Sequence, residues 1–166
     1  MICDALLAKI HEQLDSTGRL IALLPEDRLD WTPAAPGAWT PPGLLLGHLL
    51  DCMAGFCAVL AAFHPDLLGH FSGLRELPVN HRCHPDEALR RIADYRARID
   101  EGFALLTDAD LSQPVPTVFA KRGELTLTLL LLGNLEHLIN HKHQLFTYLK
   151  LLGVDVSSQD LYQFRQ

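Results

Sequence analysis

Hydrophobic positions recur about every 3.6 residues over most of the chain, and this spacing predicts helices. Residues 2–24 and 41–63 form the first two predicted helices, separated by a loop crowded with Pro and Gly. Thr40 is the predicted N-cap of the second helix, because Pro41 suits its first helical position. The second helix is apolar on most sides, which indicates a position in the core of a bundle.

Two further helices are predicted in the second half of the chain. Residues 85–106 carry a clear apolar stripe, and residues 125–152 form a long helix that Gly153 would end. Between them, the segment VPTVFAKRGELT within residues 107–126 favours a short hairpin or an extended excursion. Four helices with two long connections predict an all-α four-helix bundle, with one domain over residues 1–166.

The composition narrows the class of protein. Apolar residues make up 48% and charged residues 20% of the 166 residues, which is an ordinary globular balance. The formal net charge is −6 and basic residues are not clustered, so we expect no nucleic-acid partner. The apolar stretch at residues 44–63 could be mistaken for a membrane span, but His48 and Asp51 within it would be costly in lipid. We therefore expect no membrane partner.

The cysteines and the N-terminus bear on the compartment. The four cysteines form no Cys-x-x-Cys pair and no zinc-finger spacing, which favours reduced thiols in a cytoplasmic protein. The first residues, MICDALLAKIHEQLD, lack a basic region followed by an apolar one, so we expect no signal peptide.

Three histidines are the candidates for metal chemistry. His137 and His141 are four residues apart, so a helix places both imidazoles on one face, where their nitrogens can converge on one ion. His48 interrupts the apolar second helix and is the best candidate for a third ligand. A buried imidazole needs a partner, which is either a metal ion or a hydrogen bond to a neighbour. From the residues alone, a metal site and a metal-free histidine cluster both stay open.

Several neighbours could assist such a site. Cys52 lies one helical turn after the first histidine and is either a further ligand or a small buried hydrophobe. Asp51 could orient a ligand or act as a base, His143 is the other candidate base, and Asn134 and Gln144 could orient ligands or substrate or fill packing gaps. A rival metal cluster, which we expect to be surface histidines instead, consists of His64, His70, His81 and His84.

Two segments resemble the DinB/YfiT-like family of metalloenzymes, and the likeness extends over nearly the whole chain. They are LDWTPAAPGAWTPPGLLLGHLLD, residues 29–51, and NLEHLINHKHQLFTYLKLLG, residues 134–153. In that family, one histidine of the second helix joins a His-x-x-x-His pair of the fourth helix around a divalent metal. The resemblance therefore assigns the metal to His48, His137 and His141.

One departure from the family pattern concerns the residues after the last ligand. The family commonly has Arg-Gly there, whereas this chain has Lys142 and His143, so a bulky imidazole stands near or beside the site. The role of His143 is left open by the sequence.

The resemblance also implies a function. It implies one divalent ion, either nickel, zinc or iron, in a homodimeric thiol S-transferase that acts on small electrophiles. The thiol would be a low-molecular-weight one such as bacillithiol or mycothiol, activated as a metal-bound thiolate. One alternative is a metal-dependent hydrolase that uses a metal-bound water. The other is a non-catalytic metal-containing stress protein or small-ligand-binding protein.

Overall fold

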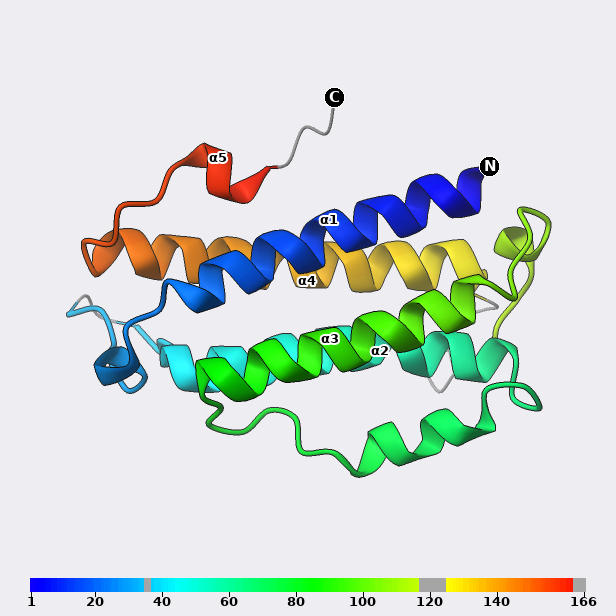
Figure 1. Ribbon diagram of the computed structural model, residues 1–166, viewed down its shortest axis with the longest axis horizontal. Coiled ribbons are helices and arrows are strands. Elements are labelled where there is room, and N and C mark those ends of the chain that lie inside the picture. The colour runs from blue at the N-terminus through cyan, green and yellow to red at the C-terminus, as the bar shows by residue number, and fades with distance from the viewer. Residues whose placement is uncertain (35–36, 117–124, 163–166) are drawn as a thin grey trace.

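The computed structural model describes residues 1–34, 37–116 and 125–162 (Figure 1). Its four long helices are α1 (Ile2–Ala22), α2 (Pro42–Phe63), α3 (Pro85–Phe103) and α4 (Leu127–Leu151). Its short helices are η1 (Glu26–Arg28), η2 (Gly69–Glu76), η3 (Asp110–Ser112) and α5 (Ser158–Leu161). The predicted all-α four-helix bundle is confirmed, and the described residues contain no strand.

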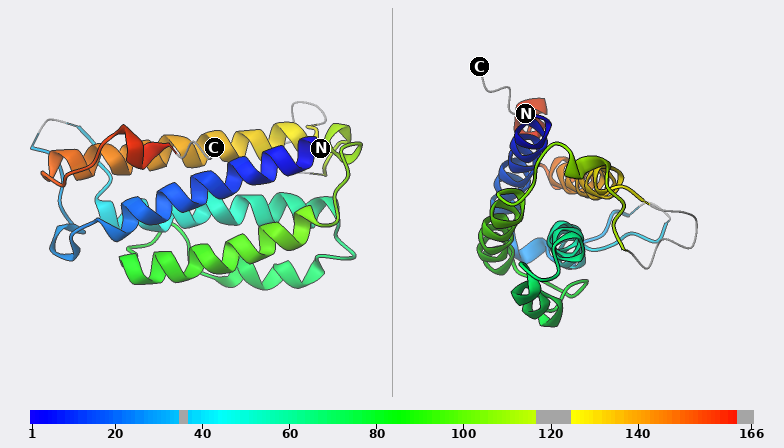
Figure 2. Two further views of the ribbon diagram at one scale, coloured as in Figure 1. Left: turned by 45° about the horizontal axis from the view of Figure 1, so that its top comes forward. Right: turned by 90° about the vertical axis from the view of Figure 1, so that its right-hand side faces the viewer.

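The four long helices form two layers, with α1 and α3 in front of α4 and α2 in Figure 1. Helix α1 packs on α3 and α4, and α2 packs on the same two helices. Helices α1 and α2 therefore lie diagonally across the bundle, as do α3 and α4, whereas the consecutive helices α2 and α3 are neighbours (Figure 2). In Figure 1, α1 and α4 run from right to left, whereas α2 and α3 run from left to right. As a result α2 and α4 are antiparallel neighbours.

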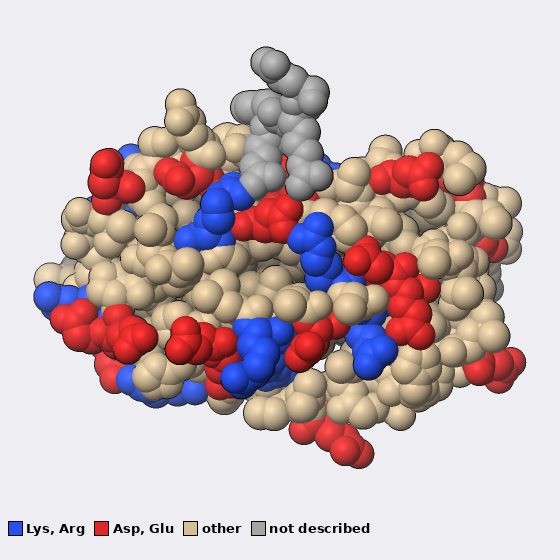
Figure 3. Space-filling model, viewed as in Figure 1, with Lys and Arg blue, Asp and Glu red and all other residues tan. Residues whose placement is uncertain are grey.

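Helix α2 supplies much of the core. Most of its leucines and Phe56 are fully buried, together with Tyr95 of α3 and Tyr148 of α4. By length and composition α2 is the one helix in the described ranges that could cross a membrane, but 56% of its most apolar window is buried inside the bundle. Burial on most sides explains its composition as that of a core helix. On the face drawn in Figure 3, acidic and basic side chains are interspersed.

The long α2–α3 connection returns along the outside of α2. Its end, residues 80–83, is held on the first half of α2 by two backbone hydrogen bonds, from Asn80 N to Gly47 O at 3.0 Å and from Cys83 N to Gly43 O at 2.9 Å. A Cβ atom on Gly47 would lie 2.0 Å from the carbonyl oxygen of His81. This close approach of two backbones explains why glycine occupies that position.

The start of α2 differs from the prediction. Pro41 is the N-cap, with φ −58° and ψ 151°, and Pro42 takes the first helical position. A residue that precedes proline is driven to extended conformation, so Pro41 cannot be helical. Thr40 therefore lies outside the helix, and the prediction that it is the N-cap was wrong.

At the other end of the bundle, the structure differs from the prediction at the start of the fourth helix. Helix α4 begins at Leu127, two residues later than predicted, because the side chain of Thr126 caps it by accepting from Leu129 N. Pro114 and Thr126 form an isolated antiparallel bridge. The predicted hairpin spans residues 115–126, of which residues 117–124 lie outside the described residues.

Candidate metal centre

The antiparallel contact between α2 and α4 brings the three predicted histidines together. His48 lies near the start of α2, whereas His137 and His141 lie one turn apart on α4. Nε2 of His48 is 3.1 Å from Nε2 of His137 and 3.1 Å from Nε2 of His141. Two nitrogens bound to one tetrahedral zinc ion at about 2.0–2.1 Å lie about 3.3 Å apart. Both distances from His48 therefore fit ligands of one ion, and the ring centroids of His137 and His141 lie 4.8 Å apart.

A chain of side-chain hydrogen bonds fixes the ring of His48. The amide nitrogen of Asn80 donates to Asp51 Oδ2 at 3.0 Å, which turns the amide oxygen toward His48. That oxygen is 2.6 Å from Nδ1 of His48. Because an amide oxygen only accepts, Nδ1 must carry the proton, and Nε2 carries the lone pair.

A second series of hydrogen bonds fixes the ring of His141. Tyr148 donates its hydroxyl to Thr40 O at 2.9 Å and accepts from Nε2 of Gln144 at 3.0 Å. The amide oxygen of Gln144 thus faces Nδ1 of His141, at 3.0 Å. This ring too is held in the tautomer with a lone pair on Nε2.

These two tautomers require a positive charge between the rings of His48 and His141. The Nε2 atoms of His48 and His141 both present lone pairs at 3.1 Å, so either a proton or a metal ion must lie between them. Burial, and then the neighbouring rings of His141 and His48, lower the pKa of His137, so this ring resists protonation. A divalent cation meets the same demand and fits the three nitrogen donors.

Cys52 is placed beside this cluster. Its Sγ and one ring nitrogen each of His48 and His137 all lie within 4.8 Å of one another. Burial raises the pKa of the Cys52 thiol to about 12, so without a cation the sulfur stays protonated. The side chain is 1% exposed, which is the position of a small buried hydrophobe that also borders the metal centre.

The remaining candidates divide into two groups. Gln144 contacts a histidine directly, and Asp51 reaches one through Asn80. Asn134 instead lies against α2 at Gly55, where an added Cβ would be 2.6 Å from its amide oxygen. His143 is exposed and lies beside the ring of Phe146 at 5.9 Å.

The rival histidine cluster does not assemble within the described residues. His70 pairs with Glu101 at 2.8 Å and His81 with Glu87 at 3.1 Å. His84 stands beside Arg82 at 3.4 Å. His70 and His84 are exposed, as a surface position predicts, whereas His64 and His81 are half-buried. His64 and His81 each have one buried ring nitrogen without a hydrogen-bond partner among the described residues.

Three supporting residues were missed by sequence reasoning: Thr40, Asn80 and Tyr148. Tyr148 follows His141 by seven residues, so helical periodicity alone could have placed it on the same face. Asn80 gave no such signal, because it meets His48 only through the tertiary fold.

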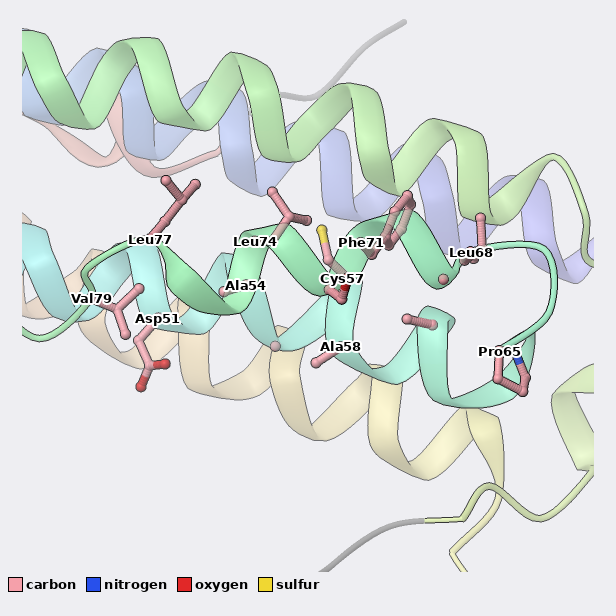
Figure 4. Close-up of a pocket in the computed structure, with 14 residues that line it drawn as sticks. Asp51, Ala54, Cys57, Ala58, Pro65, Leu68, Phe71, Leu74, Leu77 and Val79 are labelled. Carbon is pink, nitrogen blue, oxygen red and sulfur yellow. The ribbon is translucent and has the colours of Figure 1, made fainter.

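Two cavities border the site. A cavity of about 290 Å³ opens over it and is lined by Thr40, Leu44, Leu45, His48, Asn80, His141 and Gln144. A larger apolar cavity of about 450 Å³ lies between α2 and η2, with Asp51 at one end beside Leu77 and Val79 (Figure 4). We assign the chemistry to the smaller cavity, because it alone of the two is lined by imidazoles.

Comparisons with known proteins agree on one family. The family model of the DinB superfamily matches residues 9–145, which include all three histidines. The fold is similar to that of YjoA, a DinB-like protein of Bacillus subtilis, with 18% identity, a TM-score of 0.67 and coverage of 92% of this chain and 94% of that one. A DinB-like protein of Bacillus cereus matches with 18% identity, a TM-score of 0.64 and coverage of 93% and 95%. A search of curated proteins finds no significant match.

Proposed function

Because this chain belongs to the DinB superfamily and brings three imidazoles together between α2 and α4, we propose that it is a metal-dependent enzyme. One divalent ion is held by His48, His137 and His141. The observation that carries this proposal is the pair of amide contacts, which direct the Nε2 lone pairs of His48 and His141 toward each other. A cluster built only for hydrogen bonding would place a proton donor opposite each lone pair.

The reaction we propose is the transfer of a low-molecular-weight thiol to a small electrophile. The thiol sulfur forms a bond to an electrophilic carbon, the thiol proton is released, and the leaving group departs with its electron pair. When bound, the ion supplies positive charge that lowers the pKa of the thiol from its ordinary value near 8.5.

The placement of the two candidate bases favours this reaction over hydrolysis. Hydrolysis through a bound water is helped by a general base within hydrogen-bond reach. Asp51 is engaged by Asn80 on the Nδ1 side of His48, away from the converging nitrogens. His143 is exposed and lies against Phe146. A thiol needs less help, because its pKa is already close to neutral pH.

The residues of the smaller cavity would position the reactants. Leu44 and Leu45 offer an apolar wall for the carbon part of an electrophile, opposite the polar edge formed by Asn80 and Gln144. The volume of about 290 Å³ suits a small molecule. The substrate class we propose is therefore small, uncharged and partly apolar.

The first test is the metal content of the full chain, compared between wild type and His137→Ala. We expect His137→Ala to hold one tightly bound divalent ion fewer per chain than the wild type, because two imidazoles bind far more weakly than three. His143→Ala is the matched control from the same helix and should keep its ion. Equal metal in wild type and His137→Ala would contradict the assignment.

The second test is turnover. The metal-loaded protein is mixed with bacillithiol or mycothiol and a small chromogenic alkylating agent, and the thioether product is measured. Product that requires the thiol, the ion and His137 supports the transferase. Ester or amide hydrolysis without thiol would favour the hydrolase instead, and an ion without either activity would favour the binding protein.

The homodimer and the cytoplasmic location stay predictions. The four cysteines are free and buried in the structure, which suits a reducing compartment. Sedimentation equilibrium of the metal-loaded chain tests the dimer directly.

A further inference from the structure

A second group of metal-binding side chains lies at the junction between the α2–α3 connection and α3. One ring nitrogen of His81, Sγ of Cys83 and one carboxylate oxygen of Glu87 all lie within 4.8 Å of one another. These residues are separate from the three-histidine cluster, and they fall within seven positions of the sequence. The spacing is His-x-Cys-x-x-x-Glu, with the first two residues on the segment that precedes α3 and the third in the first turn of α3.

The segment that carries His81 and Cys83 is already fixed in place. Backbone hydrogen bonds tie its two ends to Gly47 and Gly43 of α2. Glu87 is fixed by α3, which Pro85 begins. A site built on backbone that is already ordered loses little conformational entropy when it binds a ligand.

The donor atoms suit a borderline-soft divalent cation. Zinc accepts imidazole nitrogen, thiolate sulfur and carboxylate oxygen, at about 2.0–2.3 Å. Nδ1 of His81 is buried and has no hydrogen-bond partner among the described residues, so one ring nitrogen is not engaged. A buried polar atom without a partner in the protein indicates that a ligand, such as a metal ion, binds next to it.

The surrounding charges favour a cation there. Arg91 lies 3.5 Å from the carboxylate of Glu87, but its guanidinium is also held by Pro78 O and by the hydroxyl of Tyr95. Without an ion the Cys83 thiol is protonated, because burial raises its pKa to about 12. Once an ion displaces that proton, the thiolate and the ionised Glu87 outweigh Arg91 and leave the protein groups at a net charge of −1 when His81 is neutral.

The group is also open to solvent on one side. Cys83 is fully buried, whereas the side chains of His81 and Glu87 are 28% and 30% exposed. Water can therefore complete the coordination of an ion that these residues bind.

We propose that His81, Cys83 and Glu87 form a second cation site, which binds zinc through one nitrogen, one sulfur and one oxygen. The bound ion ties the end of the α2–α3 connection to the first turn of α3. This proposal does not depend on the three-histidine site, because the two ligand sets share no residue.

The test uses the full chain and cobalt(II) as a spectroscopic substitute for zinc. A cysteine ligand gives an intense thiolate-to-cobalt absorption in the near ultraviolet, which an all-histidine site does not give. We expect this absorption in the wild type and in the double variant His137→Ala/His141→Ala, where the first site is destroyed. We expect it to vanish in Cys83→Ser and to persist in the matched controls Cys57→Ser and Cys52→Ser.

A second variant tests the site without changing the buried cysteine, whose substitution could itself disturb folding. Glu87→Gln keeps the shape of a partly exposed side chain and should weaken cobalt binding to the second site at least tenfold. Zinc titration of this variant should lose one equivalent relative to the wild type. Thiolate absorption that survives in Cys83→Ser, or equal zinc affinity in Glu87→Gln and wild type, would overturn the proposal. So would a wild type without the absorption.

Discussion

Asn80 joins an unusual backbone conformation to a contact with the candidate metal centre. Its φ of 56° lies in the left-handed region, and it is the one non-glycine residue with a positive φ in the described ranges. Asparagine tolerates this region better than most residues, because its short polar side chain can bond locally. Here the amide bonds outward instead and connects Asp51 to the Nδ1 atom of His48. We therefore regard Asn80 as a positioning residue.

Two substitutions separate the backbone role of Asn80 from its side-chain role. Asn80→Gly keeps the left-handed conformation and removes only the amide, so we expect metal affinity to fall about 10–100-fold, as for other partners of metal ligands. Asn80→Ala should lose the same affinity and also about 1 kcal/mol of unfolding free energy, because alanine is strained at this φ. Metal titration and urea unfolding of both variants measure the two effects. Unchanged metal affinity in Asn80→Gly would show that His48 needs no such partner.

At the scale of elements, the site depends on how closely the α2–α3 connection approaches α2. Gly47 allows the carbonyl of His81 to lie against the helix, and this approach places Asn80 next to His48. The connection thus forms a wall of the candidate metal centre as well as a link between helices.

Gly47→Ala tests that role. Its new methyl group would overlap the backbone of His81, so the connection must move. We expect a loss of about 1–3 kcal/mol in unfolding free energy, as for other overpacked sites, together with weaker metal binding. Gly133→Ala on α4 is the matched control, since an added Cβ there meets no atom of the described chain within 4 Å. That variant should be as stable as the wild type or more stable by up to about 1 kcal/mol. If Gly47→Ala were as stable as Gly133→Ala and bound metal as tightly, the close contact between the two backbones would be contradicted.

The elements that the sequence predicted are those with a local signal. The long helices follow from apolar periodicity, and the pair His137 and His141 follows from their spacing on one helix. The short helix α5 also had a local signal, the capping box of Ser157 and Asp160, which our reading of the sequence did not use. Asn80 and the order of the helices around the bundle had none, because both depend on contacts between distant parts of the chain.

At the scale of the whole molecule, the bundle buries all four cysteines, and burial has similar consequences for three of them. Burial raises the pKa of Cys52, Cys57 and Cys83 to about 12 in each case. In the unfolded chain these thiols ionise at their ordinary pKa of about 8.5–9. Between about pH 9 and pH 12 the unfolded state therefore holds fewer protons than the folded state, and stability falls as the pH rises.

The metal-free protein should show this fall in urea unfolding under reducing conditions. From pH 8 to pH 10 we expect a loss of about 1 kcal/mol of unfolding free energy for each buried thiol. Lys142 acts in the opposite direction, because burial lowers its pKa to about 8. The difference between wild type and Cys57→Ala isolates one thiol, and the variant should lose about 1 kcal/mol less. An equal loss in both proteins would show that the Cys57 thiol ionises freely in the folded state.

The topology has a consequence for protein design. All three histidines come from α2 and α4, which run in opposite directions side by side, and one returning segment adds the support at Asn80. A designer could therefore transplant this centre into any scaffold that offers two antiparallel helices and a glycine-mediated loop crossing. The sequences of the other two helices, α1 and α3, could then be chosen for expression, symmetry or attachment to a surface.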